Sequence, residues 1–182
     1  MTTQIKNIFL ILCFPCILFS QTHDTLTLQR ILDEVNVNAV GANEKTPISF
    51  TNVDLKSINE NNLGQDLPYI IAHTPSIVTT SDAGAGVGYT SLRIRGSDPT
   101  RINVTINGIP LNDSESQGVW WVNMPDFISS IEKIQIQRGV GTSTNGPSAF
   151  GASINFKTVG LMKKAYFITN NTIGSYSTLK NN

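Results

Sequence analysis

The stretch from Ile131 to Thr158 constrains the fold more than any other part of the sequence. Its first half alternates isoleucines with polar side chains, and its second half does the same around Ile154 and Phe156. Alternation with a period of two is typical of strands that bury one face. Between the halves lie residues that favour turns, namely Gly139, Gly141, Gly146, Pro147 and Gly151. The stretch therefore predicts a strand, a glycine-rich loop and a second strand.

The preceding residues predict two helices, three strands and a short helical turn. Thr51 or Asn52 is the expected cap of a helix through Val53, Leu55 and Ile58. A second helix is expected from Leu63 to His73, ended by Pro75. The expected strands begin at Ile77, run over Thr90–Gly96, and run over Ile102–Ile106 into an Asn107-Gly108 turn, and the helical turn is Phe127–Ser130. This order predicts a small α+β domain around a mixed sheet.

Charge and the amino terminus narrow the class of protein. The 13 Lys and Arg residues balance 13 Asp and Glu residues, so there is no electrostatic case for nucleic acid. Lys6, the apolar run from Ile8 to Phe19 and the small Ser20 form the pattern of a secretory signal over residues 1–20. Cys13 and Cys16 lie inside that run, so we do not interpret them as a redox or metal-binding site.

Candidate sites of catalysis fail on their chemistry. Gly141 to Gly146 has the opening spacing of a phosphate-binding loop, but Pro147 stands where the lysine that reaches the phosphates belongs. The two histidines, His23 and His73, have no carboxylates at ligand spacing. We therefore expect no catalytic residue, no bound metal and no cofactor.

Three segments read together resemble the plug domain of TonB-dependent outer-membrane receptors. They are Leu92–Gly96 (LRIRG), Asn107–Asn112 (NGIPLN) and Ile131–Thr158. The resemblance implies a plug that closes the lumen of a transmembrane β-barrel and gates energy-coupled uptake of a scarce ligand, such as an iron–siderophore complex or cobalamin. Arg138-Gly139 stands where polysaccharide-type receptors have Lys-Asp, which favours the iron-complex or cobalamin type.

The resemblance also implies a domain plan. It comprises a signal peptide (1–20), a flexible periplasmic segment (21–43), a plug (44–158) and the start of a barrel (159–182) that is cut short. Lys164 to Tyr176 is expected to be a strand without a partner, so the chain is interpreted as an amino-terminal fragment. The expected location is the outer membrane, inside the barrel and facing the periplasm.

A short alternating segment at residues 33–40 is the expected docking site for the energy-transducing partner. By pattern alone an ordinary first strand is the better interpretation, but the resemblance implies a TonB box that adds as a strand to a TonB-type protein. Its residues are Asp33, Glu34, Val35, Asn36, Val37, Asn38 and Ala39.

The resemblance assigns roles to three charged residues and to two loops. Arg95 and Arg138 are expected to pair with carboxylates of the barrel, and Glu132 to join that network. For each tryptophan of the loop after Leu111, packing and ligand contact are equally weighted. The ligand-facing candidates are Asn112, Asp113, Glu115, Gln117, Trp120 and Trp121, with Tyr89 from a second loop. The alternative function is a free-standing periplasmic binding module that reuses the plug fold.

Overall fold

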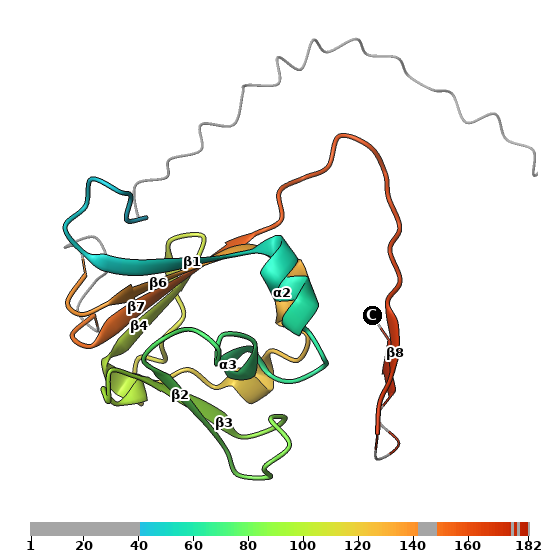
Figure 1. The fold of residues 1–182 in the computed structure, drawn as a ribbon, viewed down its shortest axis with the longest axis horizontal. Helices are drawn as coiled ribbons and strands as arrows, with labels where there is room; N and C mark the ends of the chain where they lie inside the picture. The colour runs from blue at the N-terminus through green and yellow to red at the C-terminus, as the bar shows by residue number, and fades with distance from the viewer. Residues whose placement is uncertain (1–40, 142–148, 176, 178, 182) are drawn as a thin grey trace, which may run out of the picture. The chain divides into compact units, whose positions relative to one another are not determined.

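The computed structural model describes residues 41–141, 149–175, 177 and 179–181 (Figure 1). The predicted signal peptide and the predicted TonB box lie outside these residues. The described chain contains short helices and a mixed sheet, which confirms the predicted α+β fold.

Five strands form the main sheet, in the order β1-β6-β7-β4-β5. β4 and β7 are parallel, and the other neighbours are antiparallel. A second sheet pairs β2 with β3, and a third pairs β8 with β9. The main-sheet strands are β1 (Ser49–Asp54), β4 (Ile102–Ile106), β5 (Ile109–Pro110), β6 (Ile131–Arg138) and β7 (Ala152–Thr158), and the others are β2 (Ile77–Ser81), β3 (Thr90–Ile94), β8 (Asn171–Ile173) and β9 (Leu179–Asn181).

β6 and β7 confirm the two strands predicted for Ile131–Thr158. Ile131, Ile134 and Ile136 are all fully buried, although Ile131 and Ile134 are an odd number of residues apart. The register of β6 against β7 shifts between Ile131 and Lys133, so a β-bulge returns Ile131 to the buried side. Part of the connecting loop, residues 142–148, lies outside the described residues.

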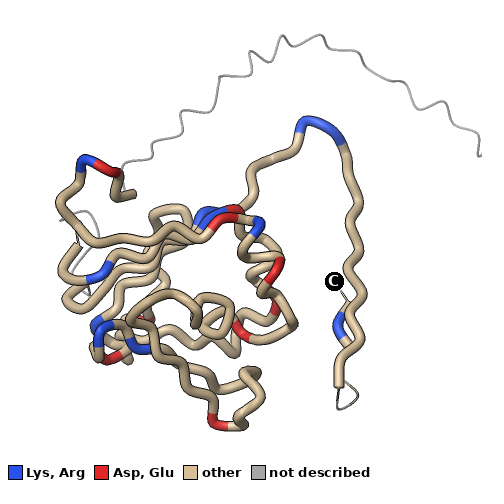
Figure 2. Tube along the Cα trace, viewed as in Figure 1, with Lys and Arg blue, Asp and Glu red and all other residues tan. Residues whose placement is uncertain are grey.

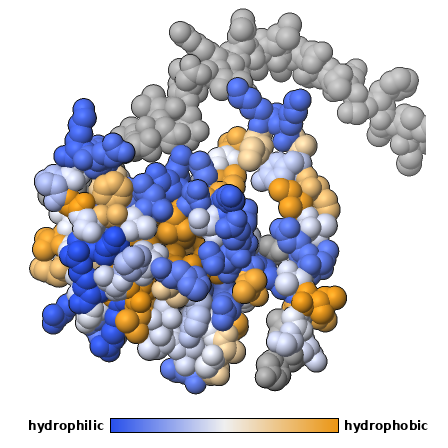
Figure 3. Space-filling model, in the orientation of Figure 1, coloured by the Kyte–Doolittle hydropathy of each residue, from blue (hydrophilic) through white to orange (hydrophobic). Residues whose placement is uncertain are grey.

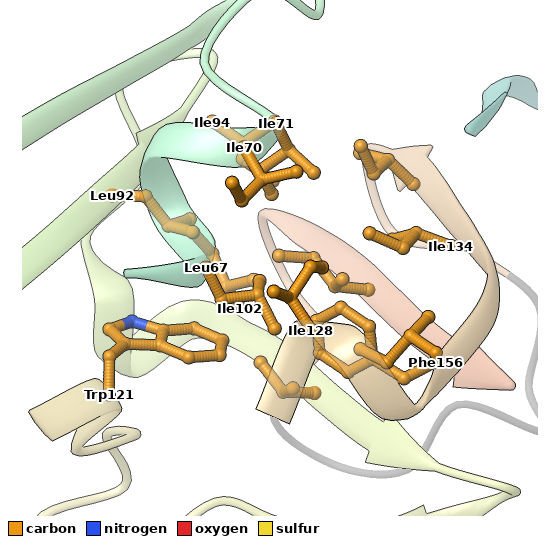
Figure 4. Close-up of a cluster of buried hydrophobic side chains, with 14 of the residues drawn as sticks. Leu67, Ile70, Ile71, Leu92, Ile94, Ile102, Trp121, Ile128, Ile134 and Phe156 are labelled. Carbon is orange, nitrogen blue, oxygen red and sulfur yellow. The ribbon is translucent and has the colours of Figure 1, made fainter. Parts of the chain in front are cut away.

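The core lies between one face of the main sheet and the helices (Figure 4). Register places Val53, Ile134, Phe156 and Ile106 in one cross-strand row and Thr51, Ile136, Ile154 and Val104 in the next. We call this side of the sheet the apolar face. Helices α2 (Leu55–Asn61) and α3 (Leu67–Ile70) contribute buried side chains, among them Ile58, Leu67 and Ile70.

The opposite side of the sheet is buried as well, but it carries amides and hydroxyls. Two cross-strand rows make up what we call the polar face: Asn52, Gln135, Asn155 and Thr105 in one, and Phe50, Gln137, Ser153 and Asn103 in the other. Its β1 members are less enclosed, since Phe50 is half-buried and Asn52 is exposed. Gln137 and Ser153 have no exposed surface, and Asn103 and Thr105 are 3% exposed. A sheet enclosed on both sides is thus apolar on one and neutral-polar on the other.

The first predicted helix was placed too early. Ser49–Asp54 is strand β1, and the helix begins only at Leu55. Asp54, not Thr51 or Asn52, is the cap, and its carboxylate accepts a hydrogen bond from the Ser57 N–H at 2.9 Å. The strand prevails because Thr51 and Val53 pair with Ile136 and Ile134, a long-range contact that local propensity does not contain.

The second predicted helix is much shorter than expected. α3 covers Leu67–Ile70, and His73 lies beyond its end. Pro68 occupies the first turn of α3. Proline has no N–H and clashes with the residue four positions earlier, so the helix cannot extend back toward Leu63.

The remaining predicted elements of the domain are confirmed. β2 and β3 pair as a hairpin around residues 82–89. Asn107 and Gly108 form a two-residue turn between β4 and β5, and both have positive φ, at 51° and 84°. That combination is required by the tight hairpin turn that Asn-Gly favours. Phe127–Ser130 is a 3₁₀ turn leading into β6.

The carboxy-terminal segment does not form the long unpaired strand that was predicted over Lys164–Tyr176. The strand is restricted to β8, Asn171–Ile173, and it has a partner, because β9 pairs with it in a hairpin. Alternation of apolar side chains indicated a strand but not its length, since length depends on pairing. Apolar side chains of this segment are exposed, with Phe167 at 88%, and they appear orange in Figure 3. The start of a barrel at residue 159 stays a prediction.

None of the helices in the described chain is long and apolar enough to cross a membrane. Within residues 41–141 and 149–175, together with 177 and 179–181, no group of three or more His, Cys, Asp or Glu side chains is arranged to hold a metal ion.

Candidate functional site

Arg95 and Arg138 lie next to each other although 43 residues separate them in sequence. Arg95 follows the last residue of β3 and has a φ of 52°, and Arg138 is the last residue of β6. One Nη of Arg95 donates to the backbone carbonyl of Arg138 at 3.4 Å. The structure therefore brings two guanidinium groups to the same end of the sheet.

The guanidinium of Arg138 is bound by hydroxyls rather than by a carboxylate. Both of its Nη atoms lie 2.7 Å from Thr51 Oγ1, and its Nε lies 3.4 Å from Ser49 Oγ. Neither Arg95 nor Arg138 takes part in an ion pair among the described residues. Hydroxyls leave the positive charge uncompensated, so both arginines retain the capacity to bind a carboxylate from outside this domain.

Glu132 is not brought together with the two arginines. It lies at the opposite end of β6 from Arg138, and its carboxylate is 3.3 Å from Lys157 Nζ on β7. Six residues of strand separate Glu132 from Arg138 by about 20 Å. Both members of this ion pair are near half exposed, and such pairs contribute little to stability. Figure 2 shows acidic and basic residues adjacent on the trace in that part of the sheet.

The loop after β5 is ordered by its own polar side chains. Asn112 accepts from the Val104 N–H at 2.8 Å and donates to the Ile102 carbonyl at 2.9 Å, so its amide extends the pairing along the edge of β4. It also donates to the Gln117 carbonyl at 2.9 Å. Asn112 is thus engaged in holding the loop, which makes it an anchor of this site.

Asp113 closes the turn that follows. Its carboxylate accepts from the Ser116 N–H at 2.7 Å, and this backbone hydrogen bond lowers the pKa of Asp113. Gln117 donates from its side chain to the Ser114 carbonyl at 2.9 Å and has a positive φ of 58°. Glu115 is exposed in the same turn. The turn keeps a fixed anionic group at the surface over the neutral pH range.

The two neighbouring tryptophans point to different environments. Trp121 is 5% exposed and meets Phe156 edge to face, with ring centroids 6.3 Å apart. In Figure 4 the indole lies at the border of the apolar cluster. Trp120 is 54% exposed. Trp121 therefore belongs to the packing of the domain, and Trp120 is the aromatic that the loop presents.

The loop of residues 82–89 is anchored to α3 and ends in a second exposed aromatic, Tyr89. The Gly86 carbonyl accepts from the Asp66 N–H at 2.8 Å, and the Ala85 carbonyl accepts from Gln65 Nε2 at 3.1 Å. Gly86 has a φ of 78°, and an added Cβ would stand 2.7 Å from Gln65 Nε2. The positive φ is what favours glycine here, since the end of the Gln65 side chain can move aside. Tyr89 is 64% exposed.

The polar face was missed by the sequence reasoning. The signal was present, because the two residues that alternate with Ile134 and Ile136, Gln135 and Gln137, are amides rather than charges. Ordinary solvent-facing strands carry Lys, Glu and Thr, whereas Gln, Asn and Ser indicate a side that is polar and enclosed.

Comparison with known proteins identifies the fold. Residues 42–153 match the family model described as TonB-dependent Receptor Plug Domain. The match covers more than half of the chain, and the chain therefore belongs to the TonB-dependent receptor plug family. No curated protein matches the sequence.

Solved structures show the same fold at low sequence identity. The alcaligin outer-membrane receptor FauA from Bordetella pertussis is 20% identical with a TM-score of 0.53, over 75% of this chain and 23% of that one. The ferric-catecholate import receptor Fiu from E. coli K12 is 18% identical with a TM-score of 0.54, over 75% and 18%. The siderophore receptor PirA from Acinetobacter baumannii is 19% identical with a TM-score of 0.50, over 62% and 17%. The chain thus spans about a fifth of the length of these receptors.

Proposed function

We propose that this chain is the plug of an outer-membrane receptor that takes up a scarce ligand, such as an iron–siderophore complex or cobalamin, with energy from a TonB-type partner. The family match over residues 42–153 carries this proposal. The fold-level relatives named as alcaligin, ferric-catecholate and siderophore receptors favour an iron complex. The function is binding and gating rather than catalysis.

The two anchored loops support a ligand-facing role. Tyr89 and Trp120 are exposed aromatics on loops that the domain holds by backbone hydrogen bonds. Rigid aromatic side chains provide a large contact area at a small cost in conformational entropy. Asp113 and Glu115 add carboxylates to the loop that carries Trp120, whereas Asn112 and Gln117 shape that loop.

The two adjacent arginines, Arg95 and Arg138, support the proposal that this domain lies inside a β-barrel. Arg95 and Arg138 are adjacent, and neither has an acidic partner in the part of the chain that the structure describes. Carboxylates on the inner wall of a barrel are the chemistry that would neutralise them. Glu132 is a candidate for a separate contact with the wall, at the other end of β6.

Ligand binding to the full-length receptor tests the role of the loops. Trp120→Ala is expected to weaken binding of an iron–siderophore complex about tenfold, equivalent to ~1.4 kcal/mol. Phe150→Ala is the matched control, because Phe150 is an exposed aromatic outside both loops, at 71%. Equal affinity of the Trp120 variant and the parent for every ligand class would contradict the proposed ligand site.

Uptake in cells tests the coupling to a periplasmic partner. Val35→Pro or Val37→Pro is expected to abolish uptake and spare ligand binding, because proline removes a donor from strand pairing. A variant that loses binding and uptake together would argue against a TonB box at residues 33–39.

A further inference from the structure

Three polar side chains of the domain form a cluster at the end of helix α2 and the start of the 3₁₀ turn before β6. Ser129 Oγ donates to Asp126 Oδ1 at 2.8 Å and accepts from Asn62 Nδ2 at 3.3 Å. Asn62 follows α2 directly, and Asp126 precedes the 3₁₀ turn. A hydroxyl has one proton to donate, and here it goes to the carboxylate, while the NH₂ group of Asn62 faces Ser129. The amide oxygen of Asn62 and the carboxylate of Asp126 then remain as acceptors.

The group that binds both acceptors is the ammonium of Lys180, in strand β9. Its Nζ lies 2.7 Å from Asn62 Oδ1 and 2.8 Å from Asp126 Oδ1. An ammonium is a compact charge with three donors on a flexible stem, which suits two converging oxygens better than the planar fork of an arginine. We call Asn62, Asp126 and Ser129 the ammonium site.

The ion pair between Lys180 and Asp126 is more withdrawn from solvent than the other two that the described residues make. The Lys180 side chain is 14% exposed and that of Asp126 is 33% exposed, whereas every member of the other pairs is at least 44% exposed. Exposed pairs are screened by water and salt, and shielded pairs are screened much less. Removing one partner of a shielded pair also leaves the other charge uncompensated. This contact is therefore suited to holding two segments together.

The stem of Lys180 lies against Gly64, in the loop between α2 and α3. A Cβ added to Gly64 would stand 3.3 Å from Lys180 Cδ and 3.9 Å from its Cβ and Cγ. Any side chain at residue 64 would crowd the stem. The surface beside the ammonium site thus has room for the methylene chain of a lysine, which covers it while the charged end reaches the acceptors.

Apolar burial does not account for the attachment of the β8–β9 hairpin. Leu179 and Ile173, which are opposite each other in the hairpin, are 78% and 84% exposed. Lys163 and Lys164, earlier in the same segment, are exposed as well. A two-stranded hairpin is at best marginally stable alone in water. The charge of Lys180 is therefore the feature of this hairpin that binds it to the domain.

We propose that the ammonium site is a docking site for a lysine side chain, and that its occupant is Lys180 of the same chain. The contact attaches the β8–β9 hairpin to the part of the domain formed by the end of α2 and the 3₁₀ turn. The segment after β7 is thus joined to the domain twice, through the backbone that leaves Thr158 and through Lys180. Docking requires neither a transported ligand nor a periplasmic partner, so it stands apart from the proposed function.

Amide hydrogen exchange in the full chain tests this attachment. The amides of β8 and β9 are expected to be protected in the parent and to exchange about tenfold faster in Lys180→Met, which keeps an apolar stem and removes the charge. Lys164→Met is the matched control, because Lys164 is an exposed lysine of the same segment, and it is expected to leave the exchange unchanged. Hairpin amides that are unprotected in the parent, or equally protected in the parent and Lys180→Met, would overturn the attachment.

A second substitution identifies the acidic partner. Asp126→Asn removes the charge, and asparagine tolerates the φ of 54° at this position. It is expected to accelerate exchange in β8 and β9 as Lys180→Met does. The double variant is expected to exchange no faster than either single variant, because both changes remove the same interaction. Additive effects in the double variant would show two independent contacts and would overturn the pairing.

Zero-length crosslinking of the parent keeps the test decisive if a variant fails to fold. A carbodiimide joins an amine and a carboxylate that are in contact, as an amide with loss of water, and the main link of Lys180 is expected to be to Asp126. An equal mixture of isotopically labelled and unlabelled chains identifies the source of the lysine. Links within one chain support the proposal. Links between differently labelled chains would make a second copy the occupant and overturn it, as would a Lys180 that does not link to Asp126.

Discussion

The two faces of the main sheet are both shielded from solvent, yet they contribute to the domain in different ways. On the apolar face, Ile134, Ile136, Ile154 and Phe156 pack against helices and aromatic rings. On the polar face, side chains pair through particular hydrogen bonds, as from Thr105 Oγ1 to Asn155 Oδ1 at 2.6 Å, whereas Asn103 Nδ2, Asn155 Nδ2 and Ser153 Oγ are buried without a partner. Burial of apolar area is additive and non-directional, whereas a hydrogen bond adds little net energy but is costly to leave unmade.

This difference separates stability from specificity within one sheet. The apolar face supplies most of the free energy that holds the domain together. The polar face selects what lies on it, because its donors and acceptors accept only a backbone or side chain with matching groups.

The largest effect is expected from placing a polar side chain on the apolar face of β6, which tests whether the two faces differ in the chemistry that they tolerate. Ile136→Gln is expected to destabilise the domain by about 3–5 kcal/mol, because a fully buried isoleucine is replaced by an amide with no partner in the core. Chemical denaturation of the full chain measures the change. A loss below about 1 kcal/mol would show that the apolar face admits polar groups, and the two faces would not differ as described.

Gly151, the residue before β7, tests whether tight packing also occurs outside the apolar face. An added Cβ on Gly151 would stand 2.3 Å from Ser97 Cβ. Gly151→Ala is therefore expected to cost about 1–3 kcal/mol in the free energy of unfolding. Ser97→Gly in the same chain removes the clashing atoms and is expected to recover most of the loss. Failure of this pairwise rescue would place the strain elsewhere, for instance at the Arg101 carbonyl, 3.3 Å from the added atom.

The reverse exchange on β6 is expected to be milder. Gln137→Ile removes the hydrogen bond from Gln137 Nε2 to Gln135 Oε1, which measures 2.9 Å, and adds apolar volume to a polar surface. The expected cost is about 1–2 kcal/mol, below that of Ile136→Gln. Denaturation under identical conditions compares the two. Equal costs at residues 136 and 137 would mean that burial, rather than the chemistry of each face, sets the energy.

Sequence reasoning captured the elements whose signals are local. β6, β7, the Asn107-Gly108 turn and the β2–β3 hairpin follow from alternation and turn residues alone. It failed at β1, where pairing with β6 overrides a weak helical pattern, and at the carboxy-terminal segment, where pairing sets the length of the strand. At the candidate site, motifs singled out Arg95 and Arg138, which the structure brings together, and the roles of these arginines and of the Trp120 loop stay predictions. It could not place Trp121 in the core or see the polar face, since both depend on register between distant strands.

The smallest expected effect comes from Asp54, which is the last residue of β1 and the N-cap of helix α2. It lies opposite Lys133 at the end of β1, and its carboxylate caps α2 on the core side. The hydrogen bond from the Ser57 N–H lowers the pKa of Asp54 in the folded chain. The stability that this cap contributes is therefore present above the pKa of Asp54 in the unfolded chain, about 4. It is lost as pH falls through the lower pKa of Asp54 in the folded chain.

Two substitutions of Asp54 separate the cap from its charge. Asp54→Asn keeps an acceptor for the Ser57 N–H, so the Tm at pH 7 is expected to change little. The acid-induced fall in Tm is expected to be shallower below about pH 4, because the titrating group is gone. Asp54→Ala removes the acceptor and is expected to lower the Tm at pH 7 as well. If Asn and Ala variants behave alike at pH 7, the cap does not hold α2, and the junction between the strand and the helix depends on packing of Ile58 instead.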